Sequence, residues 1–368
     1  MRTKILIAPG LADPKGDSVL NSAPPAWRRL AECSHITRIR ALEPQPVSES
    51  AWLGVPPHAL KIAQGPLTVA ALGHDPPERS VHFHLSLLSV DKDETVSEVH
   101  LPISESEVNG IFEAASRLSS SNLTPLQGEG VDHALVWEGG SIDLGTKKPS
   151  EVAGSIWSKH LPEGDGEPLL RRFIDDSINL LDGLELNRIR QEEGMPKLNL
   201  LWPWGQGFRE PLPNLALRRG QSVTFYSQSL RLQGLTRLTG YRHADPTGFR
   251  RGVHVSPKTI QAWWDDSGTS VILIPGLSEF RRHRREEELE HLLNTWGASF
   301  IDSCLSLNLE DEPMELTILV PSEESEGIAL QFHSHLRRQN SIPFDERIIG
   351  DTTIPLSPVE TLIESALQ

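Results

Sequence analysis

Two pairs of histidines, each separated by one residue, have a type and spacing that could support chemistry. His333 and His335 are separated by one residue, so in an extended segment both could bind a metal ion weakly. The same spacing is typical of a surface strand, which we favour. His82 and His84 repeat the pattern within Val81–Leu87, where apolar and polar residues alternate. This alternation predicts a half-buried strand with its histidines on one face.

Motifs with a more specific mechanism are absent from the sequence. It contains no Gly-x-x-x-x-Gly-Lys-Ser/Thr phosphate loop, no His-Glu-x-x-His and no Gly-x-Ser-x-Gly. Cys33 and Cys304 have no zinc-binding spacing. We therefore expect two reduced thiols, as in a cytoplasmic protein.

The composition limits the classes of partner. The 368 residues are 38% apolar and 23% charged, a balance that supports a sizeable packed core rather than disorder. The formal charge is 35 − 50 = −15, which disfavours a nucleic acid partner. The apolar run after Lys4 is too short for a signal peptide, and no segment approaches the ~20 apolar residues of a membrane span. We expect a cytoplasmic protein without a membrane partner.

Short apolar runs alternate with amphipathic helical patterns along the chain. The expected buried strands are Lys4–Ala8, His133–Trp137, Leu198–Trp202, Val223–Tyr226, Val271–Ile274 and Leu316–Val320. The expected helices are Trp27–Glu32, a helix from the Ser104/Glu107 capping box to Leu118, Pro168–Leu181 and Glu286–Trp296. This alternation predicts an α/β fold with a mostly parallel sheet and helices on both faces.

Several strand-end motifs agree, in order, with one known family. Asn187-x-x-Arg190 precedes Trp204-Gly205-Gln206-Gly207, while Pro9–Asp13, Leu53–Pro57 and Gln64–Leu67 match more loosely. Each alone is an ordinary turn of an α/β fold. Together they resemble the archaeal-type cofactor-independent (2,3-bisphosphoglycerate-independent) phosphoglycerate mutases of the alkaline phosphatase superfamily, with this chain as a degenerate member.

The resemblance implies an alkaline-phosphatase-like core at residues 1–62 and 168–368. It also implies an inserted, smaller α+β lid domain at residues 63–167.

Members of this family use two divalent metals and a serine nucleophile. By the resemblance, the first metal-binding Asp falls on Pro9, which has no ligand atom. The nucleophile falls on Gln45, or on Ser48 if a short deletion shifts the register.

Of the remaining metal positions, Glu279, His283 and His333 keep side chains that can bind a metal, and an Asp-His pair falls on Ser322-Glu323. Glu279 and His283 also lie in a basic run before Glu286, a pattern typical of a solvated helix start.

The family's anion-clamping lid arginines fall on Gln64, His84 and Asp132. His133 and Arg190 remain as candidate substrate-binding residues. His133 could equally be an ordinary strand residue, and Arg190 could pair with Glu193 or another carboxylate.

These replacements favour a phosphoglycerate mutase-like protein that has lost phosphoryl transfer and acts as a binding or regulatory module. No catalytic residue is assigned and no cofactor is expected, apart from manganese or zinc if a metal site survives. A small phosphorylated acid is the candidate ligand.

Two alternatives stay open. One is an active mutase that converts 3-phosphoglycerate to 2-phosphoglycerate in glycolysis, or a related metal-dependent phosphatase, with Ser48 as nucleophile. The other is a one-metal or metal-free ligand-binding protein that uses Glu279, His283 and Arg190. The sequence does not give the oligomeric state.

Overall fold

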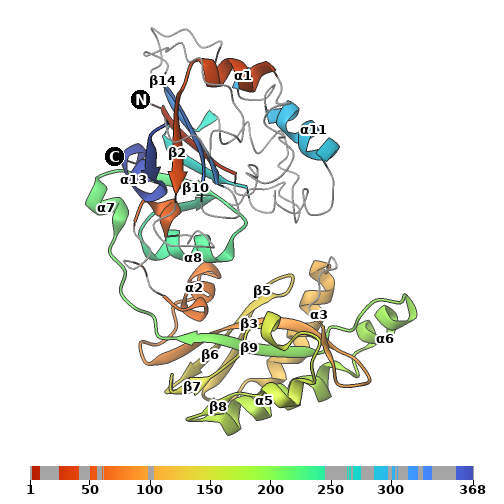
Figure 1. The fold of residues 1–368 in the computed structure, drawn as a ribbon. Coiled ribbons are helices and arrows are strands. Elements are labelled where there is room, and N and C mark those ends of the chain that lie inside the picture. The colour runs from red at the N-terminus through yellow and green to blue at the C-terminus, as the bar shows by residue number, and fades with distance from the viewer. Residues whose placement is uncertain are drawn as a thin grey trace. The chain divides into compact units, whose positions relative to one another are not determined.

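The fold is seen in a computed structural model, which divides the chain into two compact units (Figure 1). The discontinuous unit comprises Met1–Lys61 and Leu212–Gln368, and the inserted unit comprises Ile62–Pro211. The structure describes residues 2–8, 25–40, 50–55, 60, 62–97, 103–244, 263, 265–266, 268–274, 286–296, 301–302, 305, 314–321, 326–333 and 354–367.

The discontinuous unit is built around a large, mostly parallel sheet. Its strands are β1 (Arg2–Ile7), β2 (His35–Arg40), β10 (Val223–Tyr226), β11 (Arg242–Ala244), β12 (Thr269–Leu273), β13 (Met314–Pro321), β14 (Glu326–His333) and β15 (Leu356–Pro358). Its helices are α1 (Pro25–Glu32), the 3₁₀ turn η1 (Ala51–Leu53), α7 (Leu215–Arg219), α8 (Leu230–Leu238), α11 (Glu286–Trp296) and α13 (Val359–Ala366).

In the described residues the strand order is β11-β10-β12-β1-β13-β14-β2-β15. Neighbours from β11 to β13 are parallel, as are β2 and β15, and only β14 runs antiparallel to its neighbours. The predicted mostly parallel sheet is therefore confirmed.

Both faces of β1 are buried, as expected for a central parallel strand. Leu6 and Ala8 belong to a core cluster with side chains of α1 and α11, and Figure 1 shows these two helices on the same side of the sheet. Ile5 and Ile7 point to the opposite face and are equally buried. The continuous apolar run of β1 thus fits a strand covered on both sides.

The inserted unit is a smaller α+β unit. Its strands are β3 (Ser80–Val90), β4 (Val96–Ser97), β5 (Leu123–Glu129), β6 (Asp132–Glu138), β7 (Leu144–Gly145), β8 (Glu163–Gly164) and β9 (Leu200–Gly207). Its helices are α2 (Gln64–Ala71), α3 (Glu105–Ala115), η3 (Ser116–Leu118), α4 (Pro149–Val152), η4 (Trp157–His160), α5 (Glu167–Leu181) and α6 (Glu185–Glu192).

Strand β3 forms the centre of the inserted unit's sheet. It pairs antiparallel with β4, β6 and β9, and β5 pairs with the outer side of β6. Val69 of α2 packs on one face against Ala134 and Val136. On the opposite face, side chains of α3 and α5 pack against Phe83 and Leu85. The sheet is therefore covered by helices on both sides.

This covering corrects the prediction of a half-buried strand, because β3 is buried along its whole length. The polar face of β3 lies under α2, a helix that sequence reasoning treated only as a turn motif. The structure also places residues 168–211 in the inserted unit, whereas the resemblance assigned them to the core. The physical reason is that β9 pairs with β3 and α5 packs in the same core cluster.

Among the described residues, no helix is both long enough and apolar enough to cross a membrane.

Candidate functional site

The three positions that match the family's lid arginines meet in the inserted unit. Gln64 begins α2, His84 lies in β3 and Asp132 begins β6. In the antiparallel register Asp132 pairs with Ser86. Ser86 lies two residues after His84, so His84 and Asp132 share one face of the sheet. Because α2 packs on this face, residues 64, 84 and 132 become neighbours despite their distance in sequence.

Thr68 joins these three residues into one hydrogen-bonded chain. Its Oγ1 lies 2.8 Å from Nδ1 of His84 and 3.4 Å from Nε2 of Gln64. Nε2 of His84 lies 3.2 Å from Oδ1 of Asp132. The indole of Trp204 packs beside His84 with ring centroids 4.9 Å apart, and its Nε1 donates to Ser86 Oγ at 2.9 Å.

The Asp132 cluster, which consists of Gln64, Thr68, His84, Asp132 and Trp204, contains no lysine or arginine of its own. The sequences of α2, β3, β6 and β9 contain no lysine or arginine. The carboxylate of Asp132 is 50% exposed, and His84 beside it is almost fully buried. A guanidinium would hold a phosphate or carboxylate through two parallel hydrogen bonds, which an amide, an imidazole and an acid do not reproduce. These five side chains alone therefore provide no guanidinium clamp for an anionic ligand.

The second histidine of the region, His133, stabilises the local fold through both of its ring nitrogens. It is fully buried, packs on Phe112, accepts a hydrogen bond from the Gly128 N–H at 2.9 Å and donates to the Gly130 carbonyl at 3.1 Å. Burial lowers the pKa of His133 to about 3, and the nearby Asp132 carboxylate offsets only part of this. Both ring nitrogens thus hold the β5–β6 turn, although His133 was predicted to contact substrate.

His82 shares the buried β3 strand, and no described residue bonds to either ring nitrogen. Burial lowers the pKa of His82 to about 4. Both His82 and His133 therefore titrate in the folded state well below the ordinary histidine value of ~6.5.

Acid is consequently expected to destabilise the inserted unit. Between pH 6.5 and about 4 the unfolded state binds up to two more protons than the folded state. As the pH is lowered across that window, the free energy of opening the inserted unit should decrease by at most ~2.7 kcal/mol per pH unit. Hydrogen exchange of β3 amides from pH 6.5 to 4.5 measures this. A His82→Gln variant should lose about half the slope, and an unchanged slope would contradict the assignment.

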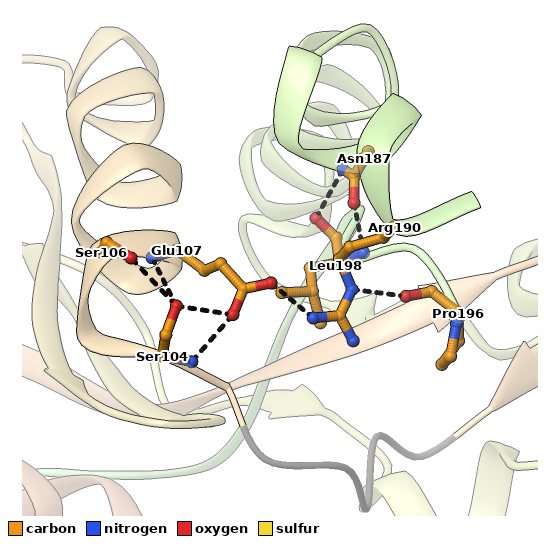
Figure 2. Close-up of polar contacts among 7 residues, drawn as sticks. All are labelled: Ser104, Ser106, Glu107, Asn187, Arg190, Pro196 and Leu198. Carbon is orange, nitrogen blue, oxygen red and sulfur yellow. Dashed lines mark hydrogen bonds and ion pairs between the residues drawn. The ribbon is translucent and has the colours of Figure 1, made fainter. Parts of the chain in front are cut away.

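Arg190, the other candidate anion contact, is an internal ion-pair partner. Its side chain is 2% exposed, with Nη1 2.6 Å from Oε1 of Glu107 and Nε donating to the Pro196 carbonyl at 2.7 Å (Figure 2). Glu107 is also the third residue of α3, where it completes the capping box with Ser104. Arg190 therefore links α6 to the start of α3.

Of the three candidate metal ligands, the structure describes only His333. Glu279 and His283 lie outside the described residues, as do Pro9, Gln45 and Ser48. His333 ends β14 opposite Glu315, and its Nδ1 lies 3.4 Å from Oε1 of that residue. By register, Glu315 pairs with Thr3, near the amino end of β1. His333 is thus distant from the carboxyl end of β1, which precedes Pro9.

In the described part of the chain, no group of three or more His, Cys, Asp or Glu side chains is placed to hold a metal ion. Most positions that the resemblance gives to the metal ligands lie outside the described residues, so no chemical step is assigned to a metal centre.

The sequence did not identify two residues of this region, Thr68 and Glu107, as contacts of the candidate residues. Thr68 carried no signal because α2 was not predicted. The Ser104/Glu107 spacing did predict the capping box, but nothing in it indicated that the same carboxylate meets Arg190.

Sequence comparisons find similarity to archaeal phosphoglycerate mutases. A 2,3-bisphosphoglycerate-independent phosphoglycerate mutase 2 of Methanothermobacter thermautotrophicus is 24% identical over 241 residues, covering 61% of this chain and 60% of that protein. The 2,3-bisphosphoglycerate-independent mutase of Methanoculleus marisnigri is 25% identical over 248 residues, covering 62% of this chain and 55% of that protein. The chain is a homologue of these archaeal phosphoglycerate mutases. No family model matches it.

Solved structures of this kind share the fold. The cofactor-independent phosphoglycerate mutase of Thermoplasma acidophilum superposes with a TM-score of 0.63 at 15% identity, covering 99% of this chain and 98% of that one. The PH0037 protein of Pyrococcus horikoshii superposes with a TM-score of 0.69 at 14% identity, covering 99% and 97%. The predicted alkaline-phosphatase-like α/β fold with an inserted α+β unit is confirmed.

The sequence matches are shorter than the structural ones. The chain spans about 60% of the length of the first of these mutases and 55% of the second. The identities of about one residue in four leave individual site residues free to differ between homologues.

Proposed function

We propose that this phosphoglycerate mutase-like protein no longer performs phosphoryl transfer and acts as a binding or regulatory module. The observation that carries the proposal is the chain from Gln64 through Thr68 and His84 to Asp132. It occupies the positions where the family resemblance places anion-clamping arginines. An acid at residue 132 repels the group that an arginine would bind.

The contacts of the remaining candidates support the same proposal. Arg190 is committed to Glu107 and the Pro196 carbonyl, and His133 to the backbone of its own turn. Neither residue would replace a lid arginine at positions 64, 84 and 132 without breaking contacts that stabilise the inserted unit.

The sequence adds support at positions outside the described residues. Proline at position 9 offers no oxygen to a first metal ion. If position 45 is the nucleophile, its amide cannot form a phosphoenzyme. Each change removes a group on which metal-assisted transfer depends. A cytoplasmic location and the absence of a resident cofactor belong to the same proposal.

Phosphorus NMR of 3-phosphoglycerate incubated with the full chain tests this proposal. Separate samples contain manganese or zinc, and the Thermoplasma acidophilum mutase under the same conditions is the positive control. We expect no 2-phosphoglycerate and no inorganic phosphate above the protein-free background. Turnover that a Ser48→Ala variant abolishes would overturn the proposal and support an active mutase with a serine nucleophile.

A further inference from the structure

The side of β3 that faces α2 carries buried polar side chains at alternate positions, namely Ser80, His82, His84 and Ser86. Ser80, His84 and Ser86 each make a side-chain hydrogen bond. In contrast, no described residue bonds to either ring nitrogen of His82. A buried imidazole ordinarily finds a partner for its N–H and for its lone pair, so His82 is the exceptional group of this surface.

His82 lies between the sheet and α2. Its cross-strand partner on β6 is Val136, which packs against Val69 of α2. The backbone of His82 is also close to the helix, because a Cβ atom on Gly65 would lie 2.0 Å from the His82 carbonyl oxygen. Since the side chain is only 2% exposed, water reaches the imidazole only if α2 moves.

The elements around His82 provide no counter-charge bonded to its ring. The sequences of α2 and β9 contain no Asp, Glu, Lys or Arg. The ionisable groups on this face of the sheet or directly after α2 are His84, Asp132, Glu138, His74 and Asp75. None of them forms a hydrogen bond with His82, and burial lowers the pKa of His82 to about 4.

The two histidines with lowered pKa values lie against different helices. On the side of α2, the buried apolar cluster is small and comprises Val69, Ala134 and Val136. The cluster on the opposite face extends through β3, β6, β9, α3 and α5. His133 packs on Phe112 of α3 at that opposite face. Protonation of His82 therefore acts on α2, which has the smaller apolar contact with the sheet.

We propose that protonation of His82 releases α2 from the sheet before the rest of the inserted unit opens. An imidazolium has two N–H donors, and neither has an acceptor among the described residues while α2 is in place. Movement of α2 lets water solvate the ring, so proton uptake and helix release are coupled. Because α2 carries Gln64 and Thr68, its release also separates the Asp132 cluster. This device does not depend on the proposed loss of phosphoryl transfer.

Hydrogen exchange of α2 and β3 peptides in the full chain between pH 6 and pH 5 tests the proposal, after correction for exchange of an unstructured chain. Release of α2 takes up one proton at His82, so α2 protection should fall by up to about tenfold per pH unit. Exchange of β3 requires the whole unit to open and takes up protons at both His82 and His133. Its protection should therefore fall by up to about a hundredfold per pH unit.

Two variants assign the protons to their helices. His82→Gln should remove the pH dependence of α2 protection and leave up to about tenfold per pH unit for β3. His133→Gln is the matched control, because its ring lies at the opposite face of the sheet. This control should keep the full pH dependence of α2 protection. If the control does not fold, the two slopes of the unmodified chain still decide the question.

Two results would overturn the proposal. Equal slopes for α2 and β3 in the unmodified chain would show that α2 opens only together with the whole unit. A slope of α2 that persists in His82→Gln would show that another group takes up the proton. Neither result bears on the proposed loss of phosphoryl transfer, which is tested separately by product formation.

Discussion

Replacing Gly65 with alanine is expected to destabilise the inserted unit by about 3 kcal/mol, the upper range for an overpacked core. A Cβ atom on Gly65 would lie 2.0 Å from the carbonyl oxygen of His82 and 2.4 Å from its carbonyl carbon. These are backbone atoms of β3, so no side chain can rotate away to make room. Helix α2 must move away from the sheet, carrying Gln64 and Thr68 out of the Asp132 cluster.

Urea unfolding of the full chain, followed with hydrogen exchange of α2 and β3 peptides, measures this effect. Gly110→Ala is the matched control, because Gly110 also lies in a helix of the inserted unit. Its Cβ would meet only the Leu186 side chain at 3.4 Å. Alanine there should be neutral or stabilising by up to ~1 kcal/mol, owing to its better helix propensity. If the two variants were equally stable, the close approach of α2 to β3 would be wrong.

Replacing Glu107 with glutamine is expected to remove about 2–3 kcal/mol of stability, the contribution of a hydrogen bond to a charged group. The effect stays below that of a fully buried ion pair because Arg190 is buried but Glu107 is 23% exposed. Burial raises the pKa of the Glu107 carboxyl, but hydrogen bonds from Ser104 and the pairing with Arg190 outweigh it and leave that pKa below its ordinary value. The glutamine would leave the guanidinium of Arg190 buried without a counter-charge. Nη2 of Arg190 already has no hydrogen-bond partner among the described residues.

Glu105→Gln is the control for this variant, because Glu105 is an exposed acid in the same first turn of α3. Its removal should change stability by less than ~1 kcal/mol, the usual contribution of an acid near a helix start. Hydrogen exchange of the α3 and α6 peptides reports the difference. Equal protection in both variants would show that the Glu107–Arg190 pair does not hold these helices together.

Much of the fold was predictable because local patterns agree with the final packing. The apolar run of β1 and the amphipathic α5 each predicted their element. Helix α2 was missed since eight residues beginning Gln64-Gly65-Pro66 resemble a turn more than a helix. Without α2, the polar face of β3 looked solvent-exposed, and the burial of His82 and His84 was missed as well.

The candidate site was less predictable because its contacts join residues far apart in sequence. The positions of Gln64, His84 and Asp132 came from the family resemblance. Only the pairing of β3 with β6 shows that His84 and Asp132 are neighbours, and only the contacts of Thr68 in α2 connect Gln64 to them. Arg190 was expected to bind an anion, yet its partner Glu107 lies 83 residues upstream. An ion pair of this kind depends on tertiary packing and leaves no local pattern in the sequence.

Isothermal titration of 3-phosphoglycerate into the full chain, with and without manganese, most directly tests the claim that the Asp132 cluster has replaced an anion clamp. We expect no saturable heat of binding in either condition, and none in an Asp132→Asn variant. The claim would be contradicted by saturable binding to the unmodified chain that is lost when Gln64 or His84 is replaced by alanine.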